Sequence, residues 1–206
     1  MTAPPAEGVL ALDRAAQDLL FRAARTANTF TAEPVTGEQI RAIHDLVKYG
    51  PTAFNAQPLR VVLLRSAGAR QRLLPHLSPA NRNKTAAAPL AVILAADTAF
   101  HEHLPRVFPH RPEARQWFDG PGNAETREAQ ARFNAALQIG YFIVGVRAAG
   151  LAAGPMAGFD PAGVDAEFFP DGRLLSLLVV NLGQPGPEAW HDRLPRLTTA
   201  DVLHTL

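Results

Sequence analysis

Apolar residues recur at the spacing of an amphipathic helix in three long stretches of the chain. The first stretch covers residues 9–24. The second follows Thr36 and Gln39, which have the spacing of a helix capping box, and it ends before Gly50-Pro51. The third and longest covers Glu125–Ala149. One side of this last stretch is apolar, and it consists of Phe133, Leu137, Gly140, Tyr141, Val144 and Ala148. We therefore expect three helices, the third of them central to the fold.

Three shorter apolar runs have the length and the β-branched content of buried strands. They are Arg60–Arg65, Leu90–Ala95 and Leu174–Leu182. A short helix is expected over Ser66–His76, between the first two runs, and a terminal helix over Thr198–Leu206. Because long helical connections separate the strands, the pattern predicts a layered α/β or α+β fold and argues against a β-sandwich.

Composition narrows the range of functions. The chain has 206 residues, 47% of them hydrophobic, which suits one globular domain over residues 1–206. The net charge is +1 and no cluster of basic residues is present, so the sequence does not indicate binding to nucleic acid or to an anionic membrane surface. The opening residues MTAPPAEGVLALD lack the features of a signal peptide, and the apolar runs are too short to span a bilayer, so we expect a cytoplasmic protein. With no cysteine in the sequence, redox chemistry would need a bound organic cofactor.

Two amide side chains stand in an uncharged segment between a predicted helix end and a predicted strand. Asn55 and Gln57 belong to the stretch GPTAFNAQPLRVVLL, which begins at Gly50. A carboxamide offers both a donor and an acceptor, as does the edge of a flavin ring, so these residues suit a neutral heterocycle. The alternative is a polar loop that ends at a proline.

Five short motifs follow one another along the chain. They are RTANTF from Arg25, PTAFNAQP from Pro51, NRNK from Asn81, GPMAGFD from Gly154 and RLPR from Arg193. Together they resemble the motifs of the FMN-dependent nitroreductase superfamily, and the resemblance covers most of the chain.

The resemblance implies a fold, a cofactor and an assembly. The expected fold is a nitroreductase-like α+β domain with a mixed central sheet flanked by helices and a long central helix. The expected assembly is an intertwined homodimer with FMN at the subunit interface. NADH or NADPH would be the electron donor, and hydride would pass through flavin N5 in two half-reactions.

The resemblance also assigns residues to the phosphate end of FMN. Arg25 and Arg193 would clamp the phosphate, for which guanidinium groups are geometrically suited, with Thr26 and Arg196 beside them. Asn28 replaces the second basic residue of the family's first motif, which weakens one cationic contact. Taken singly, each of these arginines could equally be an ordinary surface residue.

At the ring end, the resemblance implies that backbone N–H groups of Ala157 and Gly158 face flavin N5 and O4 and act as the catalytic pair, unless this loop is an ordinary turn. Asn81 would bind the ring edge and Lys84 its rim, although Lys84 could also be a surface charge. Thr52 and Asn55 would reach the partner's flavin. The expected cofactor-binding set is Arg25, Thr26, Asn28, Pro51, Thr52, Asn55, Gln57, Asn81, Lys84, Pro155, Met156, Ala157, Gly158, Arg193 and Arg196.

Within the superfamily, the stretches GPMAGFD, DAEFFP, RLPRL and LPRVFPH…ARQWF resemble the malonic semialdehyde reductase branch, which makes 3-hydroxypropionate in bacterial pyrimidine catabolism. Such a substrate carries a carboxylate, so a selective site needs a cation, and Arg115 is the candidate. Trp117 and Phe118 would exclude water over the ring. The alternative is a surface arginine beside a hydrophobic anchor.

Three other functions compete with this interpretation. A broad-specificity nitroreductase or quinone reductase would share the same motifs, and a non-catalytic flavin-binding dimer would share the fold. His101-Glu-His103, with His76 and His110, could form the metal site of a hydrolase. Because no H-E-x-x-H pattern or paired carboxylates accompany these histidines, we expect exposed loop histidines and no metal.

Overall fold

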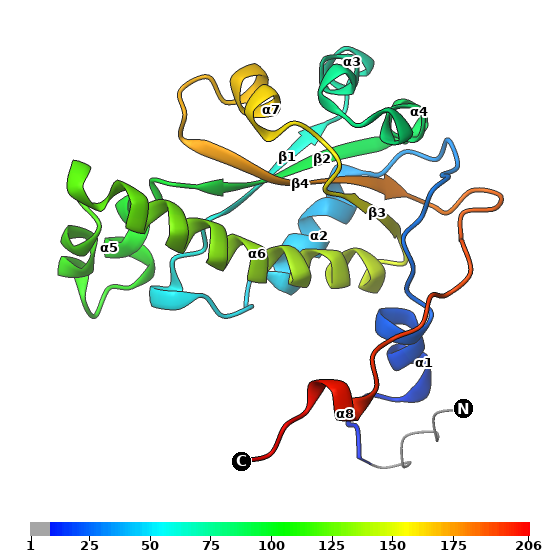
Figure 1. Cartoon of the computed structure of the whole chain (residues 1–206), viewed down its shortest axis with the longest axis horizontal. Coiled ribbons are helices and arrows are strands. Elements are labelled where there is room, and N and C mark those ends of the chain that lie inside the picture. The colour runs from blue at the N-terminus through cyan, green and yellow to red at the C-terminus, as the bar shows by residue number, and fades with distance from the viewer. Residues whose placement is uncertain (1–8) are drawn as a thin grey trace.

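Helices cover both faces of a four-stranded sheet in the computed structural model, which describes residues 9–206 (Figure 1). The strands lie in the order β1-β2-β4-β3. They are β1 (Leu59–Leu64), β2 (Leu90–Asp97), β3 (Ala152–Met156) and β4 (Leu174–Gly183). The first eight residues of the opening segment lie outside the described part of the chain.

Every strand pairing in residues 9–206 is antiparallel, whereas we expected a mixed sheet. Leu59 pairs with Ala96 across β1 and β2, and Val180 pairs with both Val92 of β2 and Pro155 of β3. Helices connect successive strands, and each strand runs antiparallel to the strands beside it in the sheet. The domain therefore has the predicted α+β architecture with an antiparallel sheet.

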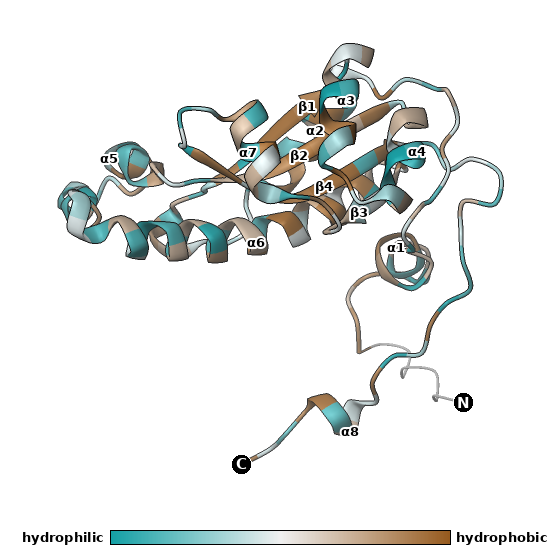
Figure 2. Cartoon of the chain, turned by 45° about the horizontal axis from the view of Figure 1, so that its top comes forward, coloured by the Kyte–Doolittle hydropathy of each residue, from teal (hydrophilic) through white to brown (hydrophobic). Residues whose placement is uncertain are grey.

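Successive side chains of β2 point alternately into two hydrophobic cores, one on each face of the sheet. Val92 and Leu94 face α2 (Gly37–Val47) and α6 (Ala124–Ala148), where they pack with Ile43 and Phe142. On the opposite face, the core residues from the strands and from the covering layer are Ala91, Ile93, Ala95, Leu73, Leu77 and Val164. All eight β2 residues are buried, and the strands form a continuous hydrophobic layer (Figure 2).

The covering layer on this second face consists of short helices. They are α3 (Ala67–Leu73), the 3-10 turn η3 (Leu74–His76), α4 (Pro79–Ala87) and α7 (Pro161–Phe168). The connection between β2 and α6 contains η4 (Phe100–His103), α5 (Leu104–Val107), η5 (Pro112–Trp117) and η6 (Pro121–Asn123). The turn η2 (Ala53–Asn55) precedes β1.

The central helix α6 is present as predicted, but its buried side differs from the expected one. Phe133, Leu137 and Tyr141, on the predicted apolar side, are 64%, 43% and 47% exposed. The side that packs on the sheet consists of Ala131, Asn134, Ala135, Ile139, Phe142, Gly145 and Val146. The helix is apolar on two sides, so periodicity alone does not identify which one meets the sheet.

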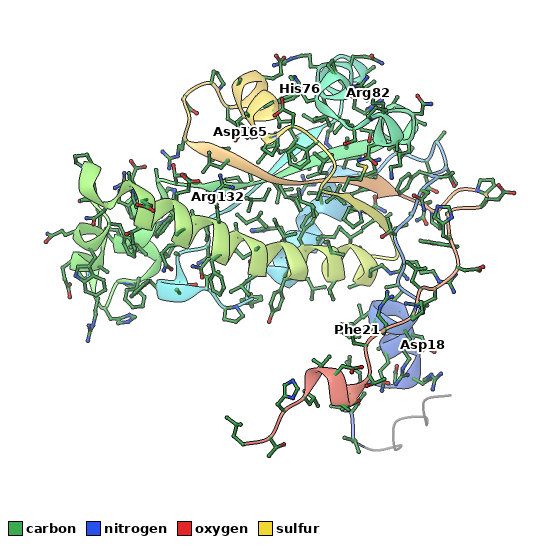
Figure 3. All side chains as sticks on the ribbon, viewed as in Figure 1. Asp18, Phe21, His76, Arg82, Arg132 and Asp165 are labelled. Atoms are coloured by element: carbon green, nitrogen blue, oxygen red, sulfur yellow. The ribbon has the colours of Figure 1, made fainter. Side chains whose placement is uncertain are left out.

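Both ends of the described chain lie outside the sheet and the helices that cover its two faces (Figure 1). The helix expected over residues 9–24 is a short α1 (Arg14–Gln17) followed by the π-helical η1 (Asp18–Arg22), and the expected terminal helix shrinks to α8 (Thr199–Val202). Short helices need tertiary packing, and within this chain these ends have little. Apolar side chains are exposed on both ends, including Phe21 (Figure 3): Val9, Leu10, Leu12, Leu19, Phe21, Leu194, Leu197, Val202, Leu203 and Leu206.

Candidate functional site

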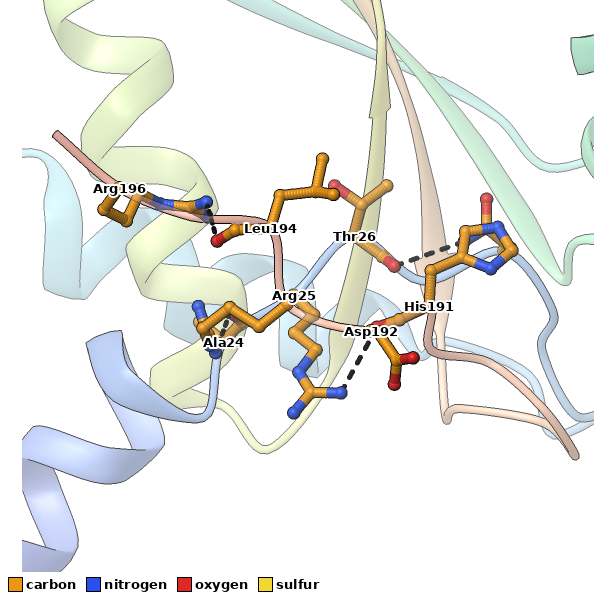
Figure 4. A pocket seen from close by; sticks show the side chains of 9 residues that line it. Ala24, Arg25, Thr26, His191, Asp192, Leu194 and Arg196 are labelled. Carbon is orange, nitrogen blue, oxygen red and sulfur yellow. Dashed lines mark hydrogen bonds between the residues drawn. The ribbon is translucent and has the colours of Figure 1, made fainter. Parts of the chain in front are cut away.

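A cavity of about 470 Å³ separates two segments that are far apart in the sequence (Figure 4). Its lining consists of Ala24, Arg25, Thr26, Asn28, His191, Asp192, Arg193, Leu194 and Arg196. The lining includes three arginines and one carboxylate, so the cavity carries an excess of positive charge. The structure therefore brings together five of the predicted site residues, at a volume typical of small-ligand pockets.

Backbone contacts hold this cationic cavity in place. A terminal nitrogen of Arg25 donates to the His191 carbonyl at 3.2 Å, and Arg193 donates to the Ala24 carbonyl at 3.1 Å and also to the Arg22 carbonyl. The Asn28 N–H donates to the Ala189 carbonyl at 2.9 Å. Each guanidinium has five N–H donors, so groups remain available for an anion such as a phosphate.

A second group of predicted residues lies where α4 meets the loop after β3. The side-chain Nδ2 of Asn81 and the backbone N–H of Ser78 both donate to the Gly158 carbonyl, at 2.9 and 3.0 Å. A Cβ atom at Gly158 would lie 2.9 Å from Asn81 Nδ2, so a side chain there would displace the Asn81 amide. Ala157, next to Gly158, is exposed. Lys84, on α4 with Asn81, is partly exposed.

The predicted residues of β3 differ in exposure. Met156 is buried, and its sulfur lies 3.9 Å from the Thr85 hydroxyl oxygen. Pro155 is partly exposed on this edge strand, which pairs only with β4 in the described chain. We did not predict β3, because its Gly-Pro pair resembles a loop.

The segment from Pro51 to Pro58 has a strained backbone. Phe54, Asn55 and Gln57 have positive φ angles of 56°, 50° and 46°, which non-glycine residues rarely adopt. The Thr52 hydroxyl accepts the Gln57 N–H at 3.2 Å, and the Gln57 side chain donates to Asn55 Oδ1 at 2.9 Å. Pro51 itself is exposed. The two amides flagged by the sequence thus contact each other within one tight loop.

Two amides of α6 support this loop, and the sequence analysis did not identify them. Asn134 is buried, its Oδ1 accepts the Ala53 N–H at 2.7 Å, and its Nδ2 donates to the Gln130 carbonyl at 2.9 Å. Gln138 accepts the Leu59 N–H at 2.9 Å. The available signal was a pair of amides spaced one helical turn apart in residues 133–146, the apolar part of the helix.

We define residues 100–123, between β2 and α6, as the aromatic segment. The Phe54 ring makes edge contacts with Phe108, Trp117 and Phe118 of this segment, at centroid distances of 5.7–5.8 Å. Phe118 is buried, whereas Trp117 is 45% exposed. The loop and the aromatic segment therefore form one packed unit.

Polar groups in the aromatic segment converge on one carboxylate. Asp119 Oδ1 lies 3.2 Å from His101 Nε2, and Asp119 Oδ2 lies 3.5 Å from Arg115 Nε. Burial lowers the pKa of His101, and the charge of Arg127 lowers it further. The expectation that His101 is an exposed loop histidine is wrong, because the residue packs in η4 beside Phe100 with only 9% of its surface exposed. Within residues 9–206, no three His, Asp or Glu side chains are placed to hold a metal ion.

The predicted site residues lie in separate regions of the chain. The cationic cavity is near the carboxyl end of α6, where Arg147 contacts the Leu19 carbonyl. The aromatic segment is near the amino end, where Arg127 contacts the Phe118 carbonyl. At about 1.5 Å per helical residue, Arg127 and Arg147 are about 30 Å apart. One chain alone thus does not bring Arg115 to the cationic cavity.

Comparison with known proteins relates this geometry to a family. The chain matches the Nitroreductase family over residues 21–183. It is 60% identical to a protein of Streptomyces griseus over 96% of this chain and 99% of that protein. A protein of Streptomyces coelicolor is 61% identical over the same shares of the two chains. Both are provisionally named NADH dehydrogenase/NAD(P)H nitroreductase.

Solved structures share the fold. A crystal structure from Bacillus subtilis, provisionally named a nitroreductase, has a TM-score of 0.83 at 19% identity and covers 94% of this chain and 100% of its own. A second structure, from Exiguobacterium sibiricum, is provisionally named a nitroreductase and was solved in complex with FMN. Its TM-score is 0.80 at 14% identity, covering 95% of this chain and 98% of its own. None of the helices in residues 9–206 has the length and apolar character to cross a membrane.

Proposed function

The chain belongs to the nitroreductase family, and on that premise we propose that it is an FMN-dependent NAD(P)H oxidoreductase that reduces malonic semialdehyde to 3-hydroxypropionate. The nicotinamide donor is supported by the names of its relatives, and FMN by the FMN complex of a protein with the same fold. The substrate rests on residues of this chain.

The single observation that carries the cofactor proposal is the cationic cavity. Arg25, Arg193 and Arg196 surround a space of ligand size, and charge-assisted hydrogen bonds from guanidinium groups are well suited to a phosphate monoester. The Thr26 hydroxyl and the Asn28 amide add uncharged hydrogen-bonding groups. These residues fit the phosphate end of FMN.

The loop after β3 fits the ring end. Asn81 and Ser78 of the chain hold the Gly158 carbonyl, and the neighbouring Ala157 is exposed, so the loop is both fixed and accessible to a flat ligand. Asn81, Lys84, Pro155, Met156, Ala157 and Gly158 would line the ring. FMN bound there supplies hydride transfer between the nicotinamide and the acceptor.

We further propose that the site is completed by a second copy of the chain. The exposed side of α6 presents Phe133, Leu137 and Tyr141, and the chain ends expose further apolar residues, so a large hydrophobic surface remains uncovered in one chain. A two-fold dimer would place one copy's aromatic segment, together with its Pro51, Thr52, Asn55 and Gln57, at the ring of the flavin that the other copy binds.

Arg115 supports the choice of acceptor. Its side chain is 49% exposed next to Trp117, so a cation and an apolar surface are adjacent. A carboxylate can bind the guanidinium while the aromatic rings exclude water from the reacting carbonyl. In the overall reaction, the aldehyde carbon gains a hydride from NAD(P)H and its oxygen gains a proton, which gives the alcohol and NAD(P)⁺.

A second candidate function is the broad-specificity reduction of nitro compounds or quinones, which the names of the relatives favour. Such acceptors need no cation. A non-catalytic flavin-binding dimer is the third alternative, and it predicts no oxidation of NAD(P)H at all.

The experiment compares kcat/KM for malonic semialdehyde and for a neutral quinone in the wild type and in Arg115→Met. Methionine keeps the unbranched stem but removes the charge. A selective loss with the semialdehyde supports the proposal. Equal losses mean that the arginine supports structure only. Arg111→Met, an exposed arginine in the same segment, is the matched control.

A further inference from the structure

Asp119 lies between two side chains of the aromatic segment. One of its oxygens is 3.2 Å from His101 Nε2, and the other is 3.5 Å from Arg115 Nε. The histidine side chain is 11% exposed, whereas the carboxylate and the guanidinium are 43% and 49% exposed. A buried imidazole, a carboxylate and an outward-facing guanidinium therefore form a chain from the interior to the surface.

The imidazole is suited to remain neutral. Its Nδ1 is buried and has no hydrogen-bond partner within residues 9–206, so adding a proton there would create an unpaired buried donor. Burial lowers the pKa of His101, as do the charges of Arg127 on α6 and Arg115 on η5, while Asp119 and Glu102 oppose them. In the neutral tautomer with its proton on Nε2, that proton is on the nitrogen 3.2 Å from Asp119 Oδ1.

The guanidinium is held by one side only. Asp119 faces Nε of Arg115, and no side-chain hydrogen bond found in the described residues uses the terminal nitrogens of this arginine. Those nitrogens form the part of the guanidinium that binds a carboxylate in a bidentate manner. The ion pair at Nε draws the guanidinium toward Asp119 without occupying that edge.

We propose that Asp119 is a positioning residue for anionic acceptors: anchored by His101 through one oxygen, it orients Arg115 through the other and leaves the terminal nitrogens for the substrate carboxylate. This inference rests on the proposed function of Arg115. It adds a residue that touches no substrate but sets the preference between charged and neutral acceptors.

The first test measures the coupling in the FMN-loaded protein without any acceptor. The pKa of His101 is followed by NMR titration of the imidazole signals, which are assigned by comparison with His101→Gln. Asp119→Asn removes a negative charge and should lower this pKa, whereas Arg115→Met removes a positive charge and should raise it. Glu113→Gln, a carboxylate on the same segment, should leave it unchanged. An unchanged pKa in both Asp119→Asn and Arg115→Met would overturn the inference and leave the proposed function intact.

The second test is kinetic. Asp119→Asn should raise KM for malonic semialdehyde about tenfold, with kcat, the quinone kinetics and the flavin spectrum close to wild type. Asp119→Glu, which retains the charge, should recover most of the loss. If Arg115→Met is selective but Asp119→Asn behaves as Glu113→Gln does, the inference fails and the proposed function stands. If Arg115→Met loses both acceptors equally, both fail.

Discussion

The side-chain Nδ2 of Asn55 donates a 2.8 Å hydrogen bond to the carbonyl oxygen of Val107. This contact joins the loop that precedes β1 to the aromatic segment, 52 residues further along the chain. The sequence motif predicts that Asn55 binds a flavin, and the structure shows that its amide contacts the segment that carries Arg115. One side chain can therefore link the loop motif to the acceptor side of the site.

Replacing Asn55 by glycine tests this link, because glycine adopts the positive φ angle of this position but lacks the amide. Loss of the hydrogen bond should destabilise the contact by about 1 kcal/mol and increase amide hydrogen exchange in residues 104–118. Exchange in β2 should not change. Wild-type protection of residues 104–118 in this variant would show that the aromatic segment is ordered without Asn55.

Replacing Arg25 by alanine should weaken FMN binding by about 2–3 kcal/mol, because one charge-assisted contact to the phosphate is lost. The same result is expected for Arg193→Ala. Fluorescence titration of the apoprotein with FMN measures both. Arg72→Ala, on α3 and outside both the cavity and the aromatic segment, is the control. If FMN affinity is unchanged in both cavity variants, the phosphate does not bind there.

The buried carboxylate of Asp97 at the end of β2 gives a prediction about stability. Burial raises its pKa, but hydrogen bonds from Arg173 and the charge of Arg60 outweigh that effect and hold the pKa below its usual value. Arg173→Met should lower the free energy of unfolding by about 2 kcal/mol, because a buried charge loses one of its two partners. Arg72→Met breaks an exposed ion pair with Glu167 and should cost less than about 1 kcal/mol. Urea denaturation at neutral pH would contradict the prediction if the two variants were equally stable.

His101 gives a prediction about pH. Its pKa is lower in the folded protein than the ordinary value of 6.5, so between these two values the unfolded chain binds more protons than the folded one. The free energy of unfolding should therefore fall as the pH drops below about 6.5, and this contribution should level off below the folded pKa. Urea denaturation across pH 5 to 8 should show a shallower fall in His101→Gln than in the wild type. A wild-type slope in His101→Gln would refute this account.

Much of the fold could be predicted from the sequence because its signals are local. The capping box at Thr36 and Gln39 is present, and β1, β2 and β4 lie where the apolar runs indicated. The strand β3 was not predicted because proline is typical of loops, and Pro155 is tolerated here only because β3 is an edge strand. Sequence periodicity does not show which of the two apolar sides of α6 packs on the sheet, because that depends on the tertiary structure.

The candidate site was predictable in part for the same reason. The motifs assigned Arg25 and Arg193, which are far apart in the sequence, to one phosphate site. The structure places both residues at one cavity. The burial of His101 could not be predicted, because it depends on tertiary packing around a side chain whose type is common at surfaces. The amides of Asn134 and Gln138 stand out in the sequence of α6, but the backbone groups that they bind are known only from the tertiary structure. Arg115 remains a prediction that rests on its chemistry and on its place in the aromatic segment.

The measurement that tests the central claim most directly is an anaerobic titration of the purified protein with NADH and NADPH, followed by visible absorbance. The account predicts a yellow protein with one FMN per chain, whose absorbance near 450 nm is bleached by about one equivalent of NADH or NADPH and restored by malonic semialdehyde. A protein that neither contains nor binds FMN, or whose flavin is not reduced by either nicotinamide, would contradict it.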